Sequence, residues 1–206
     1  MLPGGSIMVC FFLVSLLALV VRNWNLTRMI ETAWRKTPEY QGGFLLDGGV
    51  HTLAAIRLLL GQEAAPTSLS AYTSLLQKHL PPHDTINSIW KLKSGVSGTI
   101  AMSFGSTYTT KDISVSGEKG SVTIANDKIV VRKFENGKQE VVKEIDAVWK
   151  DFGVTNEVRA WAKSLENGKQ DERQSPEQAL ADLELLEGML VSGDNGGAVQ
   201  NLSLQI

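Results

Sequence analysis

Three kinds of hydrophobic pattern follow one another along the chain. Leu53, Ile56 and Leu60 recur at helical intervals, which predicts a buried helix over residues 50–60 that ends at Gly61. The middle of the chain alternates between apolar and polar positions, as strands do, and the last quarter returns to helical spacing. This order predicts a sheet with helices before and after it.

The alternating stretch predicts a meandering antiparallel sheet. Its links are short and rich in turn residues, and the Asn136-Gly137 pair favours a type I′ hairpin. Strands joined by such links are antiparallel neighbours. The expected strands lie at residues 68–73, 85–92, 97–104, 112–116, 121–125, 128–134 and 139–145.

Two amphipathic helices are predicted to close the chain. The apolar face of the first is formed by Val154, Val158, Trp161 and Leu165. The second opens with a capping box at Ser175 and has an apolar face formed by Leu180, Leu183, Leu186 and Leu190. The predicted fold class is therefore α+β, with an open, mostly antiparallel β-sheet and helices packed on one face.

Residues 7–21 form an apolar run that is interrupted only by Ser15. The run is shorter than the roughly 20 residues that a membrane-spanning helix needs, and it has neither a basic region before it nor a clear cleavage site after it. It could be a weak signal peptide or anchor, a buried strand or helix, or a segment foreign to the fold. The third interpretation is favoured, because a strand in this place should be shorter and less uniformly apolar.

Composition narrows the class of protein. The 206 residues are 43% hydrophobic and 20% charged, with a net charge of −2, as in soluble globular proteins. No basic stripe is visible, so nucleic acid is not an expected partner. Cys10 is the single cysteine, which excludes an intramolecular disulfide and a cysteine-based zinc cluster. A cytoplasmic location is expected, and membrane association is not.

The strongest candidate for chemistry lies in the glycine-rich string GGFLLDGGVH at residues 42–51. Asp47 and His51 are four residues apart at the start of the predicted helix, so their side chains share one face. Such a carboxylate and imidazole could bind hydroxyl groups, and the imidazole could move a proton. The alternative is that Asp47 caps the helix and His51 is a satisfied core histidine. The residues alone favour this alternative slightly.

Weaker candidates flank this string. Trp34, Arg35 and Tyr40 could line a substrate pocket, although plain packing explains Trp34 equally well. His79 and His83 could form a metal site with Asp84, but the prolines between the two histidines prevent a helical ligand pair. We therefore expect a loop there and no metal site.

The string GGFLLDGGVH, preceded by WRKTPEY, resembles the Gfo/Idh/MocA family of oxidoreductases, the glucose-fructose oxidoreductase and inositol dehydrogenase group. The second-domain pattern of that family, GG-x-L-x-D-x-G-x-H, is matched here by Gly42, Gly43, Leu45, Asp47, Gly49 and His51. The turn Gly117-Glu118-Lys119-Gly120 and the closing helix also resemble that family. The resemblance covers residues 27–199 and is greatest to fungal members.

The resemblance implies that complete members hold NAD or NADP in an N-terminal Rossmann domain and interconvert hydroxyl and carbonyl groups on sugars, inositols or related molecules. It implies substrate contact for Asp47 and proton transfer or substrate positioning for His51. The family's catalytic lysine belongs to a Glu-Lys-Pro segment, which this sequence lacks, as it lacks the dinucleotide fingerprint G-x-G-x-x-G and hence a Rossmann domain.

The expected organisation is a hydrophobic segment of uncertain origin at residues 1–25, a substrate and oligomerisation domain at 26–199, and a tail at 200–206. The expected function is that of a C-terminal domain that binds a sugar-like small molecule, is truncated and inactive alone, binds no cofactor by itself, and forms a homo-oligomer through the sheet face. The alternatives are a non-catalytic β-sheet dimerisation module and, third, a membrane-anchored fragment.

Overall fold

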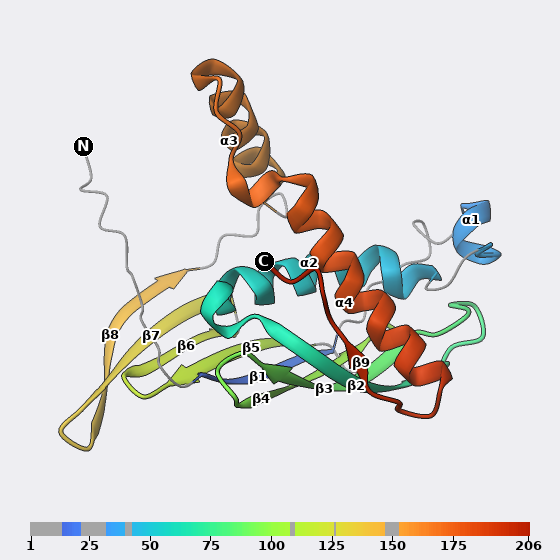
Figure 1. The fold of residues 1–206 in the computed structure, drawn as a ribbon, viewed down its shortest axis with the longest axis horizontal. Coiled ribbons are helices and arrows are strands. Elements are labelled where there is room, and N and C mark those ends of the chain that lie inside the picture. The colour runs from blue at the N-terminus through green and yellow to red at the C-terminus, as the bar shows by residue number, and fades with distance from the viewer. Residues whose placement is uncertain (1–13, 22–31, 40–42, 108–109, 126, 147–152) are drawn as a thin grey trace.

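A nine-stranded sheet forms the centre of the computed structural model, which describes residues 14–21, 32–39, 43–107, 110–125, 127–146 and 153–206. The strand order is β8-β7-β6-β5-β1-β4-β3-β2-β9, and of these neighbours only β1 and β4 run parallel (Figure 1). The strands are β1 (Val14–Val21), β2 (Pro66–Ser74), β3 (Thr85–Leu92), β4 (Ser97–Ser103), β5 (Thr110–Gly117), β6 (Gly120–Ala125), β7 (Lys128–Glu135), β8 (Lys138–Asp146) and β9 (Gln200–Asn201).

The helices lie on one side of this sheet (Figure 1). They are α1 (Ala33–Lys36), α2 (Gly43–Leu60), α3 (Val154–Asn167) and α4 (Pro176–Asp194), with short 3-10 turns at Gln62–Ala64 and Glu172–Gln174. The α+β class and the open, mostly antiparallel sheet are confirmed. So is the hairpin turn, since Asn136 and Gly137 have φ values of 52° and 73°, as a type I′ turn requires.

Strand β1 corrects the favoured interpretation of the N-terminal apolar run. Residues Val14–Val21 pair in parallel with β4 and antiparallel with β5, in the middle of the sheet. They are therefore part of the fold and not a segment foreign to it. A strand that is paired along both edges lies inside the sheet, where near-continuous apolar runs are tolerated. The rest of the run, residues 7–13, lies outside the described residues.

Helix α2 begins seven residues before its predicted start, because its glycines are helical rather than part of a loop. A Cβ added at Gly48 would lie 2.8 Å from Cζ of Phe104, and one added at Gly49 would lie 2.8 Å from Cε of Met102. These glycines let the helix backbone approach the end of β4 closely. Asp47 consequently lies in the second turn of the helix and does not cap it.

The core lies between the sheet and helices α2 and α4. Helix α4 packs on β2 and β3, and α2 packs on α4, β1 and β5. The largest fully buried side chains include Leu45, Leu53, Ile56, Trp90 and Leu185. Helix α2 is long and apolar enough to cross a membrane, but these buried leucines identify it as a core helix of this domain.

The apolar face predicted for α4 is partly wrong. Leu186 and Leu190 are buried as expected, but Leu180 and Leu183 are exposed. The helix instead turns Ala181, Leu185 and Met189 toward the sheet, because these residues follow one another at intervals of four along one side. The cap is as predicted: the Ser175 hydroxyl accepts a hydrogen bond of 3.2 Å from the Gln178 amide.

Helix α3 departs from the prediction that helices pack on the sheet. None of its residues is buried, and the helix projects away from the sheet (Figure 1). The predicted amphipathic helix therefore exists, but the described residues do not cover its apolar face.

The C-terminal residues carry structure that the sequence pattern did not reveal. Strand β9 pairs with β2 at Ser68 and Leu69. The Glu184 carboxylate accepts hydrogen bonds from the amides of Ser203 and Leu204, at 2.6 and 3.0 Å. These contacts attach the last residues of the chain to α4.

Candidate functional site

Asp47 projects from the second turn of α2 and is held by Arg35, which follows Trp34 in the short helix α1. Nε and Nη2 of Arg35 both donate to Oδ2 of Asp47, at 3.1 and 2.8 Å. The side chains are 15% and 33% exposed respectively, so the pair lies at the surface but is partly shielded. Since both bonds end on Oδ2, Oδ1 has no hydrogen-bond partner among the described residues.

Arg35 is itself fixed from two further directions. Its Nη1 donates to the Thr32 hydroxyl at 3.1 Å, and its guanidinium carbon lies 4.1 Å from the centre of the Trp34 ring. A cation at this distance from an indole face is attracted by the ring quadrupole. Trp34 remains 52% exposed. The structure therefore brings Trp34, Arg35 and Asp47 together, whereas Tyr40 lies outside the described residues.

His51 lies one helical turn after Asp47 and is exposed. It is not a satisfied core histidine, because its ring has no hydrogen-bond partner in the described part of the chain. The α2 periodicity places its Cα–Cβ bond on the same side of the helix as that of Asp47. The two residues thus present a carboxylate oxygen and an imidazole side by side toward solvent, and together these groups can bind and deprotonate a hydroxyl group.

The start of α2 rests on the loop between β2 and β3. Gly43 has a φ of +43° and lies so close to the Pro81 carbonyl that no side chain would fit there. The loop is held by the buried Asp84, whose Oδ2 accepts hydrogen bonds from the Leu76 and Gln77 amides at 3.1 and 2.7 Å. Sequence reasoning missed this support for the site, because a single aspartate in a loop has no distinguishing pattern.

The weak metal hypothesis finds no support in these contacts. The Asp84 carboxylate is occupied by loop amides and by the Thr85 hydroxyl, and His83 Nε2 lies 2.9 Å from Asp194 Oδ1. Within the described ranges, no group of three or more His, Cys, Asp or Glu side chains could hold a metal ion. The loop interpretation of residues 79–84 is the one that fits.

A dinucleotide does not fit the residues that are described. Its site needs a glycine-rich turn between a strand and a helix of a parallel βαβ unit. The one parallel pair of the sheet, β1 and β4, is separated in sequence by β2 and β3 and forms no such unit. We therefore assign no cofactor contact to the described residues and derive no chemical step through a cofactor.

An open, mostly antiparallel sheet with helices on one side is the architecture of a domain found in known oxidoreductases. A model of the "Oxidoreductase family, C-terminal alpha/beta domain" matches residues 16–200. The chain belongs to this family, the Gfo/Idh/MocA oxidoreductases, and forms the C-terminal domain. The family resemblance inferred from the motif is confirmed.

Individual relatives agree with this assignment. The chain is 37% identical over 177 residues to dehydrogenase FPY6 of the fungus Fusarium mangiferae, a match that covers 84% of this chain and 50% of that protein. An oxidoreductase from Thermotoga maritima is 30% identical with a TM-score of 0.62, over 91% of this chain and 52% of that one. Levoglucosan dehydrogenase, in complex with NADH and levoglucosan, shares the fold, with a TM-score of 0.72 at 12% identity over 92% of this chain and 58% of that one. The chain thus spans about half the length of these relatives.

Proposed function

We propose that this chain provides the substrate-facing half of the active site of an NAD(P)-dependent oxidoreductase that acts on a sugar, an inositol or a related polyol. The observation that carries the proposal is the orientation of Asp47. Two bonds from Arg35 fix one carboxylate oxygen, the other has no partner among the described residues, and the exposed imidazole of His51 lies one turn away.

Each group has a definite role in this proposal. Asp47 accepts a hydrogen bond from a substrate hydroxyl, and His51 accepts or returns the proton of the hydroxyl that becomes a carbonyl. The exposed ring of Trp34 offers an apolar surface for the C–H face of a sugar. Arg35 acts through Asp47, since its guanidinium is already bonded to that carboxylate. A role for Tyr40 in substrate binding stays a prediction.

The hydride carrier, NAD or NADP, belongs in this proposal to the half of the family's length that the chain does not span. The levoglucosan dehydrogenase complex with NADH and a sugar derivative supports that class of cofactor and substrate. We therefore expect the 206-residue chain to bind substrate weakly and to catalyse no hydride transfer alone. Turnover of NADH or NADPH with a sugar carbonyl by the purified chain would contradict this expectation.

The proposal is tested by NMR titration of the ¹⁵N-labelled chain with myo-inositol and glucose. We expect shifts of the Trp34 indole N–H and of the amides around Asp47 and His51. Asp47→Asn should weaken binding by about tenfold or more, because a hydrogen bond to a charged group contributes about 1.5–3 kcal/mol.

Asp146→Asn is the matched control, because it makes the same change at an exposed position of β8, far from α2 in the sheet order. It should leave the titration unchanged. Two results would remove the support for a substrate site at Asp47. One is an equal loss of polyol affinity in Asp47→Asn and Asp146→Asn, and the other is no shift of the Trp34 indole N–H with either polyol.

Self-association through the sheet is a second candidate function. No described helix covers the other face of the sheet, which carries the exposed Ile89 beside small hydroxyl residues such as Thr99. We expect light scattering to show a dimer of the wild-type chain and a monomer of Ile89→Lys. A wild-type chain that remains monomeric at high concentration would count against this candidate.

A further inference from the structure

The pentapeptide Glu-Asn-Gly-Lys-Gln occurs twice in this chain, at residues 135–139 and at residues 166–170. An asparagine that is followed by glycine is particularly prone to deamidation, because glycine has no side chain that would shield its backbone nitrogen. The nearest sequence neighbours of the two asparagines are identical. A difference in reactivity between Asn136 and Asn167 must therefore come from the structure around them.

Deamidation requires the backbone nitrogen of the glycine to reach the side-chain carbonyl carbon of the asparagine. This nitrogen bonds to Cγ, and its proton leaves with the side-chain nitrogen as ammonia, so that a five-membered succinimide ring forms. Water then opens either ring carbonyl and gives aspartate or isoaspartate, without any oxidation or reduction. The reaction is favoured where the glycine N–H donates no hydrogen bond and where its peptide unit can rotate toward the side chain.

The first copy forms the hairpin turn between β7 and β8 and meets both conditions. Asn136 and Gly137 are the two central residues of the turn, and both are exposed. Neither the Gly137 N–H nor the Asn136 side chain has a hydrogen-bond partner among the described residues. The strands are joined across the flanking residues Glu135 and Lys138, so the central peptide unit can rotate without breaking a hydrogen bond.

The second copy ends helix α3, and there hydrogen bonds restrain the same sequence. The Gly168 N–H donates to the Leu165 carbonyl at 3.3 Å, and the Lys169 N–H donates to the Ser164 carbonyl at 3.1 Å. Asn167 is itself the last helical residue. Because these bonds close the helix, rotation of the peptide unit between Asn167 and Gly168 would first have to open its last turn.

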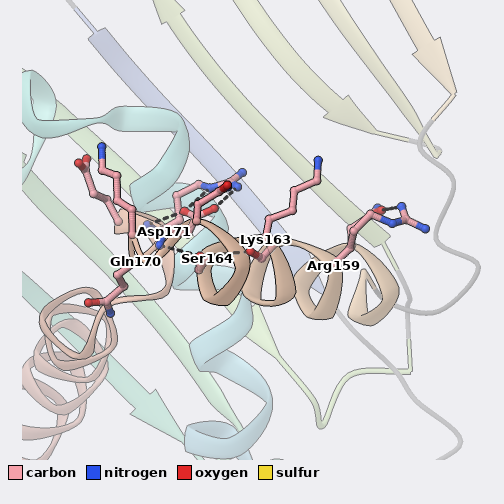
Figure 2. A pocket seen from close by; sticks show the side chains of 11 residues that line it. Arg159, Lys163, Ser164, Gln170 and Asp171 are labelled. Atoms are coloured by element: carbon pink, nitrogen blue, oxygen red, sulfur yellow. Dashed lines mark hydrogen bonds and ion pairs between the residues drawn. The ribbon is translucent and has the colours of Figure 1, made fainter.

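The turn after α3 restrains this second copy further. Residues 167–173 and α3 line a polar groove, whose cations include Arg159 (Figure 2). Asn167 is one of the residues that line this groove. The Ser164 hydroxyl accepts a hydrogen bond of 3.0 Å from the Asp171 amide, so the turn is attached to the last part of the helix (Figure 2). Opening the helix end would disturb this attachment as well.

A third Asn-Gly pair, Asn195-Gly196, follows helix α4 and is also restrained. The Gly196 N–H donates to the Gly193 carbonyl at 3.3 Å, and the Asn195 side chain donates to the Val191 carbonyl at 2.8 Å. The side-chain carbon that would be attacked is therefore anchored to the helix. Within the described ranges, the hairpin pair is the one that combines an unbonded glycine N–H with an unbonded asparagine side chain.

We propose that Asn136 is a deamidation site and the first asparagine of this chain to react, an inference that does not rest on the proposed function. Conversion to aspartate keeps the turn, since Asp-Gly also favours a type I′ hairpin. Conversion to isoaspartate adds one carbon to the backbone of a two-residue turn, on whose length the strand register depends, and so loosens the pairing of β7 with β8 at its tip. Both products add a negative charge beside Glu135.

The test compares the two copies in one sample by mass spectrometry, after incubation of the 206-residue chain near neutral pH. Trypsin releases them in separate peptides, residues 134–138 and 164–169. We expect Asn136 to deamidate about tenfold or more faster than Asn167 in the folded chain, because the end of α3 must open before its asparagine can react. In concentrated urea the two rates should become equal, since the pentapeptides are identical.

Two aspartate variants separate the copies further. Asn136→Asp keeps a residue that the turn accepts but removes its amide, so the ammonia released by the folded chain should fall to the slow rate of the remaining asparagines. Asn167→Asp makes the same change in the second copy and should leave the loss of amide from Asn136 unchanged. Circular dichroism checks that both variants remain folded.

Three outcomes would overturn the inference. Equal rates at Asn136 and Asn167 in the folded chain would show that the structure does not distinguish the copies. A faster reaction at Asn167 would show that the end of α3 opens more readily than the hairpin turn rotates. A faster reaction at Asn195 would assign the first site to the end of α4. Each of these outcomes leaves the polyol titration, and with it the proposed function, to be decided separately.

Discussion

The two ends of the sheet differ in how they are completed. Around β2 and β3, helices α2 and α4 enclose a core in which Leu53 and Trp90 have no exposed surface. Around β7 and β8, every residue of the edge strand is exposed, and the helix that follows, α3, buries no residue. One region encloses a hydrophobic core, and the other is an extension of the sheet that is followed in the chain by a helix without buried residues.

The difference teaches that one region of the chain supplies both the core and the proposed site, whereas the other exposes apolar surface. The core region holds α2 in place and thereby orients Asp47 and His51, so the substrate side of the proposed site depends on packing that the chain provides by itself. The other region contributes little to that packing. Its apolar residues remain in contact with water, so they contribute little hydrophobic stabilisation.

The sharpest way to break this comparison is to remove the same side chain from each region. Leu53→Ala should lower the free energy of unfolding by about 4 kcal/mol, because it leaves a cavity among fully buried side chains. Leu165→Ala removes the same atoms from α3, where the side chain is 64% exposed, and should change the free energy by less than about 0.5 kcal/mol. Urea unfolding followed by circular dichroism measures both. Similar losses of unfolding free energy in the two variants would show that α3 is already packed in the isolated chain.

A second test concerns the ion pair that ties the core region together. Arg57 donates to Oδ1 of Asp182 at 2.7 Å and to the side chain of Gln205 at 2.9 Å, so it links α2, α4 and the C-terminal residues. Arg57→Met should lower the free energy of unfolding by about 3 kcal/mol, because it leaves a buried carboxylate without its partner.

Two further variants sharpen this test. The double variant Arg57→Met/Asp182→Leu should recover much of the loss, since both charges are then absent. Lys128→Met breaks the exposed Lys128–Glu144 pair of β7 and β8 and should leave the unfolding midpoint unchanged. A larger loss of stability in Lys128→Met than in Arg57→Met would contradict the comparison, because β7 and β8 would then contribute more to stability than the core around α2 and α4.

The sequence pattern predicted the regular elements well and their surroundings less well. Strand β3 lies at its predicted residues, and the turn at Asn136-Gly137 is as expected, because alternation and turn chemistry are local properties. The apolar face of α3 was also located correctly. Its exposure was not predicted, because periodicity shows that a face is apolar and does not show what covers it.

The candidate site was predicted in composition but not in detail. The motif located Asp47 and His51 on one helix, and Arg35 was named as a neighbour. Arg35 and Asp47 are twelve residues apart in sequence, and their contact depends on the position of α1 relative to α2, which no local pattern encodes. The support from Asp84 could not be predicted for the same reason, since its partners are loop amides that any residue type provides.

The smallest expected effect concerns the turn that follows α3 and fixes its polar side. The side chain of Arg173, and then its backbone amide, donate to the Asp171 carboxylate and lower its pKa from 3.8 to about 2. The carboxylate therefore stabilises the turn fully above pH 3.8, and this contribution is lost as the pH falls through 2. Arg173→Gln should raise the pKa of Asp171 toward 3.8, but not fully, because the backbone hydrogen bond remains. Carboxyl ¹³C NMR between pH 1.5 and 6 measures the shift, and Arg159→Gln, which removes a cation from the same groove, is the control. If Asp171 titrates near 3.8 in the wild-type chain, the turn is open in solution and the polar side of α3 is as unsupported as its apolar face.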